Sequence, residues 1–399
     1  MQKKTKDKLS FDSKAVYYDP DPSSNSLTAP LYLSNNFQYD QQIYQNIVDG
    51  ARITENIYGR CGNPNESLLQ DHISLLENAD DCLVLASGMA AITTTCLSLL
   101  RPGDHIVSDW TTYSSTHEMF DHRLTDFNIT TSFVNCNDIN AVKNAITSNT
   151  KILYFETIAN PNMRVTNIEP LVELAHANNI LVVCDNTFAS PYVMRPLDWG
   201  VDIVVESATK FMGGHNDVLG GIIAIKQNNL PDEFMHKLRW STHVKLGGVL
   251  SPFNAWLLLR GLQTLPVRVE KQCQSAFTIA KHLENHPKVL KVHYPGLKSH
   301  PDHKVAHRQM PKYGAMLTFE VNDGDAAIET CSNLELCAFA ASLGSVRTIT
   351  QIPATMAFLD IPKAERELMN IKDGMIRISV GLEDPIDIID DINQALKII

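Results

Sequence analysis

Two segments of the chain carry residues that could do chemistry together. "VVESATKFMGGHNDVLGG" (204–221) runs from an apolar stretch into Ser207, Thr209 and Lys210, and "ILVVCDN" holds Asp185 near its end. A lysine between apolar residues and a glycine-rich turn is a candidate for burial, which favours the neutral amine that forms imines. The aspartate and the two hydroxyl groups would add an acid and hydrogen-bond donors to that amine.

A third segment offers an anion site. Ser87, Gly88 and Met89 stand between the apolar run "DCLVLA" and the helix-like run "SGMAAITTTCLSLL". The first N–H groups of a helix are free and its dipole favours negative charge, so a phosphate could bind there. Ligands of open α/β sheets bind beyond the carboxyl ends of the strands, where all three segments are expected to lie.

Pyridoxal phosphate needs this set of groups: a lysine for its Schiff base, an acid for its pyridinium nitrogen and donors for its phosphate. On this interpretation the three roles fall to Lys210, to Asp185, and to Ser207 and Thr209. Taken singly, an aspartate after a strand is more often a turn or N-cap residue, and a lysine is usually solvated. Their order and their common place at strand ends favour the cofactor site.

The surrounding pattern predicts the elements that position this set. Apolar runs such as "HIVSDW", "KILYFE" and "DIVVE" alternate with helix-like runs, which predicts a mostly parallel sheet covered on both faces. After about residue 250 a long helical pattern gives way to mixed strands and helices. We therefore expect an extended N-terminal arm at residues 1–60, a cofactor-binding α/β domain at 61–250 and a smaller α+β domain at 251–399.

Composition excludes several functions. The net charge of −11 disfavours binding to nucleic acid or to anionic membranes. No apolar run reaches the length of a membrane span, and the N-terminal lysines lack the apolar region of a signal peptide. The eight cysteines include no CxxC pair. We expect a reduced, cytoplasmic protein that binds neither nucleic acid nor a membrane.

Two other patterns carry little weight. His300, His303 and His307 could suggest a metal site, but no cysteine or well-spaced carboxylate completes a zinc set, so we expect a surface turn and no metal. The segment "GGHNDVLGG" lacks the GK[ST] of a P-loop and the spacing of a dinucleotide site.

Five segments, in order "ENIYGRCGNPN", "ASGMAAI", "YFETIANPN", "SATKFMGGHNDVLGG" and "IRISVGLED", together resemble a known family. They are similar to the pyridoxal-phosphate enzymes of cysteine and methionine metabolism, a group that includes cystathionine γ-synthase, cystathionine γ- and β-lyases and methionine γ-lyase. The resemblance runs from about residue 27 to the C-terminus. It implies an α/β fold of the PLP-dependent transferase type (fold type I).

The resemblance also implies roles for individual residues. Lys210 would form the imine and move protons, Asp185 would pair with the pyridine nitrogen, and Tyr113 would stack on the ring and act as acid or base near the leaving group. Arg377, helped by Asn160 and Ser342, would clamp the substrate α-carboxylate. The phosphate would be held by Ser87, Gly88, Met89, Ser207 and Thr209, and by Tyr58 and Arg60 of a neighbouring subunit in a homotetramer of active-site-sharing dimers.

The expected reaction is elimination from a sulfur amino acid such as cystathionine, homocysteine or methionine. An α,γ-elimination, with α,β-elimination as a second activity, would give a 2-oxo acid, ammonia and a thiol. A γ-replacement synthase is the first alternative, because it shares the early steps. A cofactor-binding protein without turnover is a more remote alternative.

The chain departs from the family pattern at a few positions. Ser114 and Ser115 follow Tyr113, where methionine γ-lyases carry a cysteine, and Phe358 replaces a usual histidine. Glu118 and Arg347 have the charges that relatives carry in the opposite arrangement. We predict that these two residues face the distal part of the substrate; the alternative is that one or both point to solvent.

Overall fold

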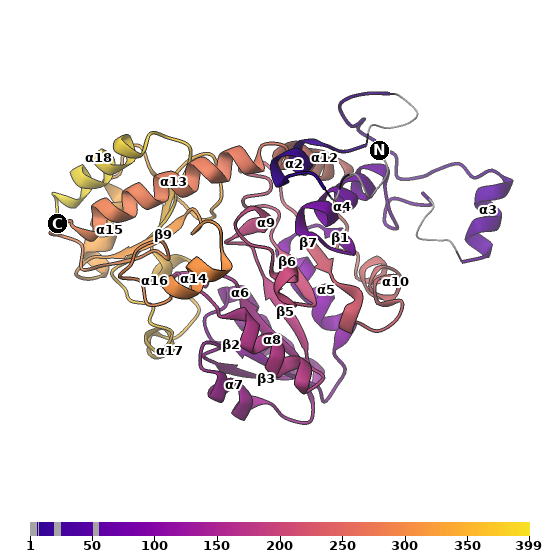
Figure 1. Ribbon diagram of the computed structural model, residues 1–399, viewed down its shortest axis with the longest axis horizontal. Helices are drawn as coiled ribbons and strands as arrows, with labels where there is room; N and C mark the ends of the chain where they lie inside the picture. The colour runs from indigo at the N-terminus through magenta and orange to yellow at the C-terminus, as the bar shows by residue number, and fades with distance from the viewer. Residues whose placement is uncertain (1–5, 7, 20–24, 51–55) are drawn as a thin grey trace.

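The computed structural model describes residues 6, 8–19, 25–50 and 56–399. Two sheets organise them: a seven-stranded sheet of order β1-β7-β6-β5-β4-β2-β3 and a five-stranded sheet of order β10-β11-β12-β9-β8. In Figure 1 the long helix α13 (Leu265–Glu284) runs between the two parts of the molecule. The predicted α/β architecture with a smaller C-terminal α+β part is confirmed.

The larger sheet is mostly parallel, as predicted. Strands β3, β2, β4, β5 and β6 run parallel to one another, whereas β7 lies antiparallel between β1 and β6. The sequence pattern did not indicate β3, which is only partly buried, or β7, which follows the glycine-rich turn. The strands are β1 (Asp81–Leu85), β2 (His105–Asp109), β3 (Thr130–Val134), β4 (Thr150–Glu156), β5 (Leu181–Asp185), β6 (Ile203–Glu206) and β7 (Gly221–Ile225).

Alternate residues of these strands feed two separate cores, one on each face of the sheet. In β1, for example, Cys82 and Val84 belong to one core and Leu83 and Leu85 to the other. This period of two explains why the strands read as continuous apolar runs. Helices α4 (Pro64–Glu77), α8 (Ile168–Ala177) and α12 (Pro252–Leu262) cover the first core, and α5 (Gly88–Leu99) and α10 (Phe234–Lys237) cover the second.

The smaller sheet has its own core against α13, α15 (Gly324–Ser332) and α18 (Pro385–Leu396). The first half of α13 packs into the larger core and the second half into the smaller one. Because α12 also buries its apolar side in the larger core, the packing changes within α13 rather than at residue 250. The strands are β8 (Lys291–His293), β9 (Met316–Glu320), β10 (Ala338–Phe339), β11 (Ile349–Gln351) and β12 (Met375–Ser379).

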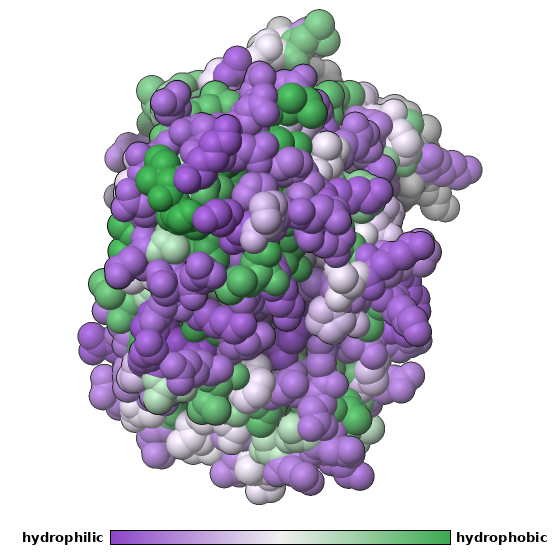
Figure 2. Space-filling view, turned by 90° about the vertical axis from the view of Figure 1, so that its left-hand side faces the viewer, coloured by the Kyte–Doolittle hydropathy of each residue, from purple (hydrophilic) through white to green (hydrophobic). Residues whose placement is uncertain are grey.

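Short helices complete the described chain. The α-helices are α2 (Phe11–Val16), α3 (Gln41–Val48), α6 (Ser114–Glu118), α7 (Ile139–Ala145), α9 (Ser190–Val193), α11 (Val244–Leu246), α14 (His303–Gln309), α16 (Pro353–Met356) and α17 (Lys363–Leu368). The π-helical and 3-10 segments are η1 (Met119–Arg123), η2 (Thr125–Phe127), η3 (Pro196–Trp199), η4 (Gln227–Asn229) and η5 (Leu238–His243). In the parts of the chain that the structure describes, no helix is long and apolar enough to cross a membrane. Figure 2, which views the side of the C-terminal domain, shows a mostly hydrophilic face with smaller hydrophobic patches.

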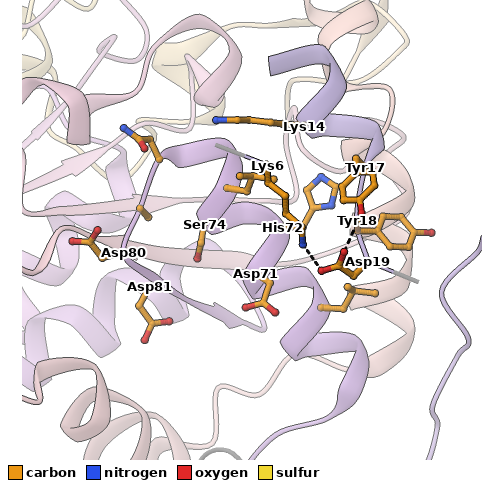
Figure 3. A pocket seen from close by; sticks show the side chains of 14 residues that line it. Lys6, Lys14, Tyr17, Tyr18, Asp19, Asp71, His72, Ser74, Asp80 and Asp81 are labelled. Atoms are coloured by element: carbon orange, nitrogen blue, oxygen red, sulfur yellow. Dashed lines mark hydrogen bonds and ion pairs between the residues drawn. The ribbon is translucent and has the colours of Figure 1, made fainter. Parts of the chain in front are cut away.

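The described part of the predicted N-terminal arm packs on the body in one place and projects from it in another. Helix α2 packs on the body, because Phe11 stacks edge-on against Tyr192 at 5.4 Å and Ala15 is fully buried. Figure 3 shows the end of α2 beside His72 of α4 around a cavity of about 370 Å³. Helix α3, in contrast, buries no residue and projects away from the body in Figure 1.

Candidate active site

A cavity of about 510 Å³ lies where the carboxyl ends of the parallel strands face the smaller sheet. It collects residues from both halves of the chain, some of them more than 200 positions apart in sequence. The predicted site residues that line it are Ser87, Gly88, Met89, Tyr113, Asn160, Asp185, Ser207, Thr209, Lys210, Ser342 and Arg377.

One end of the cavity is an anion cradle at the start of α5. Ser87 is the N-cap, and its Oγ accepts from the Ala90 N–H at 3.1 Å. A Cβ on Gly88 would lie 2.8 Å from Cβ of Ser207, so the two segments meet only because residue 88 is glycine. Thr209 Oγ1 exchanges hydrogen bonds with the backbone of Gly220. Helix N–H groups, a dipole and hydroxyls in this space fit the phosphate of pyridoxal phosphate.

Lys210 follows β6 in a tight turn and points across the cavity. Its Nζ donates to Ser342 Oγ at 2.9 Å. Burial and the neighbouring Arg377 guanidinium lower the pKa of Lys210 to about 8. A much larger share of this amine is therefore neutral at physiological pH than for an ordinary lysine, which suits imine formation.

Asp185 ends β5 beneath the same cavity. Its Oδ1 accepts from the Thr187 N–H at 2.9 Å, and the Tyr154 hydroxyl donates to Oδ2 at 3.4 Å. Burial raises the pKa of Asp185, and the hydrogen bonds from Thr187 and Tyr154 offset part of this rise. A cation in front of the carboxyl group would favour its ionised form. These features fit the pyridinium nitrogen of the cofactor.

Arg377 lies on β12 and is almost fully buried. Its guanidinium donates to Asn160 Oδ1 at 2.8 Å and to the Ser342 carbonyl at 3.0 Å, and it lies 5.7 Å from the Phe188 ring centre. Burial lowers the pKa of Arg377 to about 10, which leaves it cationic at neutral pH. Its Nε has no partner among the described residues. A planar cation held in this way can bind both oxygens of a carboxylate.

Other predicted residues do not reach this cavity. Arg60 donates to the Val244 carbonyl at 2.8 Å and lies over the Tyr58 ring, and neither residue lines the cavity of its own chain. Glu118 and Arg347 are both exposed and lie outside the lining. The prediction that these two charges face the distal part of the substrate therefore gains no support from the chain's own cavity and stays a prediction.

Phe358 and the predicted histidine turn make packing contacts with neighbouring side chains. Phe358 is fully buried in a small core with Ile361, Met369 and Ile371. His303 and His307 stack with Tyr313. Across residues 6, 8–19, 25–50 and 56–399, no three His, Cys, Asp or Glu side chains gather to hold a metal ion.

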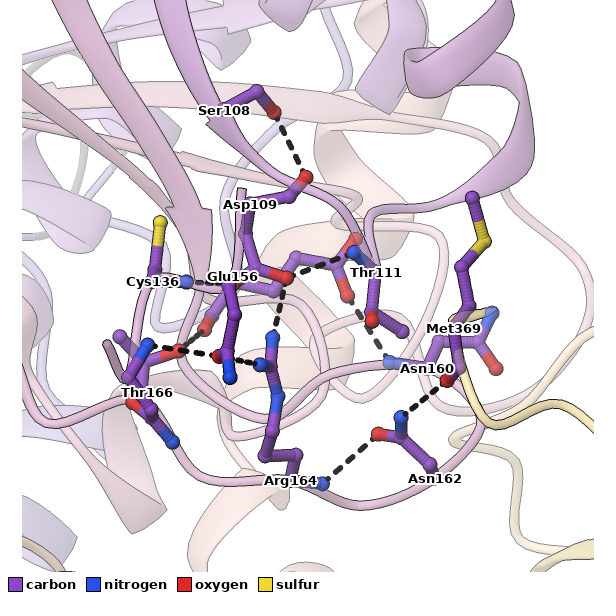
Figure 4. Close-up of polar contacts among 12 residues, drawn as sticks. Ser108, Asp109, Thr111, Cys136, Glu156, Asn160, Asn162, Arg164, Thr166 and Met369 are labelled. Carbon is purple, nitrogen blue, oxygen red and sulfur yellow. Dashed lines mark hydrogen bonds and ion pairs between the residues drawn. The ribbon is translucent and has the colours of Figure 1, made fainter. Parts of the chain in front are cut away.

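Sequence reasoning missed several residues of the cavity wall, above all Glu156, Thr187, Phe188, Gln351 and Asp360. Glu156 ends β4 as Asp185 ends the adjacent β5, and the two pair in register. The same strand-end pattern in "KILYFE" could have indicated it. Figure 4 shows Glu156 inside a network of polar contacts that includes Asn160, Asp109 and Arg164. Arg164 forms an ion pair with the buried Asp109.

Comparisons with known proteins agree with this geometry. The family model described as "Cys/Met metabolism PLP-dependent enzyme" matches residues 13–397. The chain is 41% identical to an L-methionine γ-lyase of Fusobacterium nucleatum over 93% of this chain and 94% of the relative. It is 43% identical to a cystathionine β-lyase of Bacillus subtilis, over 85% and 86% of the two chains.

A solved structure gives the same result. A protein from Campylobacter jejuni described as an O-acetylhomoserine (thiol)-lyase, which contains N'-pyridoxyl-lysine-5'-monophosphate, superimposes with a TM-score of 0.93 at 28% identity. The superposition covers 98% of this chain and 100% of the other. The predicted pyridoxal phosphate cofactor and the predicted class, a carbon–sulfur lyase of this group, are confirmed. The chain belongs to the Cys/Met metabolism PLP-dependent enzyme family.

Proposed function

We propose that this lyase eliminates the sulfur substituent from Cγ of a homocysteine-type amino acid, with elimination from Cβ as a second activity. The products are a 2-oxo acid, ammonia and a thiol. The proposal rests on the amine of Lys210, whose lowered pKa favours the neutral form. Lys210 donates to the hydroxyl of Ser342, and the carbonyl of Ser342 accepts from Arg377 in the same cavity. The relatives named for methionine γ-lyase and cystathionine β-lyase activities support it.

Pyridoxal phosphate, when bound, supplies an electron-withdrawing ring that stabilises negative charge at the substrate Cα. Asp185 would hold a proton on the ring nitrogen, and Tyr113 would stack on the ring. The phosphate would lie at the start of α5, bound by Ser87, Gly88, Met89, Ser207 and Thr209.

Arg377 and Asn160 would orient the substrate through its α-carboxylate, which places the Cα proton near Lys210. The neutral amine of Lys210 would remove that proton. For elimination from Cγ, it would first return this proton to the bound substrate–cofactor pair and then remove a proton from Cβ before the sulfur departs. Its lowered pKa, about 8, allows it both to accept and to return protons near neutral pH.

Tyr113 is the proposed acid that protonates the leaving sulfur. It precedes α6 at the mouth of the cavity, and its side chain is 41% exposed, so it can reach a group that extends outward from Cγ. Ser114 and Ser115, which also line the cavity, are small enough to leave room for that group.

The assembly and the compartment follow as part of the proposal. Tyr58 and Arg60 lie outside the cavity of their own chain, and α3 projects with no buried residue, which supports an arm that completes the site of a neighbouring subunit in a homotetramer. All eight cysteines are free thiols and seven are buried, which supports a reducing, cytoplasmic setting.

A panel of sulfur amino acids tests the function. Purified enzyme is incubated with methionine, homocysteine, cystathionine and cysteine, and 2-oxo acid, ammonia, thiol and sulfide are measured together. We expect 2-oxobutyrate from the γ-substituted substrates. The similarity to the O-acetylhomoserine (thiol)-lyase supports a γ-replacement synthase as the alternative function. Such an enzyme would instead form a new thioether when a thiol and an O-acylated homoserine are added. Release of no ammonia from any substrate would contradict the lyase proposal.

A further inference from the structure

Glu156 occupies a position that neither the cofactor nor the substrate clamp explains. It is the last residue of β4 and only 6% exposed, yet it carries a carboxyl group with no cation in hydrogen-bonding contact among the described residues. A buried carboxyl group is costly unless its hydrogen bonds are made. The hydrogen-bond partners of the Glu156 carboxyl group therefore indicate its role.

Both carboxyl oxygens accept from backbone N–H groups of the active site. Oε1 accepts from the Tyr113 N–H at 2.5 Å, and Oε2 accepts from the Asn160 N–H at 3.2 Å. Tyr113 stands on the side of the proposed leaving group, and Asn160 accepts from Arg377 on the side of the substrate carboxylate. One side chain thus joins the two walls of the cavity.

The support beneath Glu156 is rigid. Its own carbonyl accepts from Thr166 Oγ1 at 2.7 Å, and its backbone pairs with Asp185 in the centre of the larger sheet. The loop from Glu156 to Thr166 is closed by an antiparallel β-bridge between Ile158 and Val165. Figure 4 shows Asn160 and Glu156 in the same network. The sheet therefore fixes the carboxyl group, and the carboxyl group fixes two loops.

We propose that Glu156 is a positioning residue that sets the distance between Tyr113 and the Asn160–Arg377 clamp. The Tyr113 carbonyl is held by backbone hydrogen bonds within α6, whereas its N–H donates to Glu156, so that bond ties the start of α6 to the larger sheet. The loop of Asn160 has a second anchor, the bond from Asn162 Nδ2 to the Met369 carbonyl at 3.1 Å. Loss of the Glu156 carboxyl group would therefore loosen the backbone at Tyr113 more than the loop that carries Asn160.

The two backbone N–H groups each need an acceptor oxygen, which a carboxyl group at position 156 supplies. A glutamine at position 156 keeps one acceptor but turns an NH₂ group toward one of the two backbone N–H donors, so one contact becomes donor against donor. An aspartate keeps two acceptors on a side chain shorter by one methylene. We therefore expect Glu156→Asp to retain more function than Glu156→Gln.

The chain offers a matched control in Glu206. It ends β6, is 2% exposed, and its Oε1 accepts from Asn186 Nδ2 at 2.9 Å rather than from Tyr113 or Asn160. Glu206→Gln makes the same change of group in a similarly buried place at the same edge of the sheet. A glutamine there can still accept from Asn186.

Amide hydrogen exchange of the folded protein is the first test and does not depend on turnover. In Glu156→Gln, the Tyr113 amide should exchange at least about 10-fold faster than in the unchanged protein, and the Asn160 amide less so. Both should be unchanged in Glu206→Gln. If the two amides keep their protection in a folded Glu156→Gln, the proposal is wrong.

Kinetics are the second test and rest on the proposed lyase function. With whichever substrate the enzyme turns over, Glu156→Gln should lower kcat by about 10- to 100-fold and change KM by less, because the misplaced wall is that of the proposed acid. Glu156→Asp should recover part of the loss, and Glu206→Gln should stay within about threefold of the unchanged enzyme. Equal losses in both glutamine variants, together with equal falls in melting temperature, would show a general effect of burial and overturn the positioning role. If the unchanged enzyme has no measurable activity with any substrate of the panel but the exchange result holds, the lyase function fails and the positioning role stands.

Discussion

Two cavities of comparable size within the described residues differ in how their charges are paired. In the N-terminal cavity of about 370 Å³, Lys6 pairs with Asp19, Asp80 with Lys226 and Asp81 with Arg239, while Lys14 lines the wall without an ion pair among the described residues. In the cavity of about 510 Å³, the described residues give Lys210 a hydroxyl partner and Arg377 an amide and a carbonyl, with no carboxylate bonded to either.

This difference in charge pairing distinguishes a ligand-binding site from a space left between packed helices. Two cations without anionic partners in a buried space favour an incoming anion, whereas paired charges gain little from one. The active-site cavity is thus prepared for a phosphate and a carboxylate. The N-terminal cavity is a space between α2 and α4 (Figure 3). Changes in the first should affect chemistry, and changes in the second only stability.

The largest effect is expected at Lys210. In Lys210→Ala, the rate of 2-oxo acid formation should fall by about 10³-fold or more, because no other side chain of the cavity supplies an amine base. Borohydride treatment should then attach no pyridoxyl group at that position. Lys6→Ala, which removes a lysine from the other cavity, is the control and should change the rate by less than about twofold. Comparable losses in the two variants would remove the distinction between the cavities.

Arg377→Lys should have the next largest effect. The substitution keeps the charge but removes the planar fork that binds two oxygens, so KM should rise by about 10- to 100-fold, with a smaller fall in kcat. Steady-state kinetics with the best substrate of the panel measure both values. An unchanged KM would show that the carboxylate binds elsewhere.

The pH dependence of cofactor incorporation should show the lowered pKa of Lys210, about 8. Only the neutral amine attacks the aldehyde, so incorporation into the cofactor-free protein should speed up as the pH rises and level off above about pH 8 rather than above about pH 10.4, the value of an ordinary lysine. The same shift makes the folded state more stable as the pH rises from about 8 to 10.4, because over that range the unfolded state binds more protons. Stopped-flow absorbance of the cofactor measures the rate. A rate that keeps rising to pH 10 would show an unperturbed lysine.

The smallest effect is expected at His72, in the N-terminal cavity. The residue is 2% exposed, its ring lies beside the backbone of Ala15, and burial lowers its pKa to about 4. His72→Phe replaces a buried polar ring with an apolar one beside free space, and should raise the free energy of unfolding by about 1 kcal/mol. Urea denaturation measures this value, while kcat/KM should stay within about twofold. A clear loss of activity would link the N-terminal cavity to the chemistry.

Sequence reasoning located the local parts of the site well. Asp185, Ser207 and Lys210 each end or follow an apolar run, and local periodicity determines where such runs end. For Glu118 and Arg347, which are exposed and outside the chain's own cavity, the substrate-facing role stays a prediction, because a place in a motif does not decide which way a side chain points. Sequence reasoning passed over Glu156, whose role depends on the loops of Tyr113 and Asn160.

The sequence by itself determined the α/β alternation, the position of Asp185, Ser207 and Lys210 at the ends of strands, and the family, because these are properties of short segments in a given order. Only the tertiary structure decided that β7 enters antiparallel between β1 and β6, and that Arg377 of the smaller sheet meets Asn160 and Ser342. It also decided that Lys210 and Arg377 meet in one cavity with no carboxylate bonded to either among the described residues. Contacts between distant segments depend on the packing of the whole chain, and no local pattern records them.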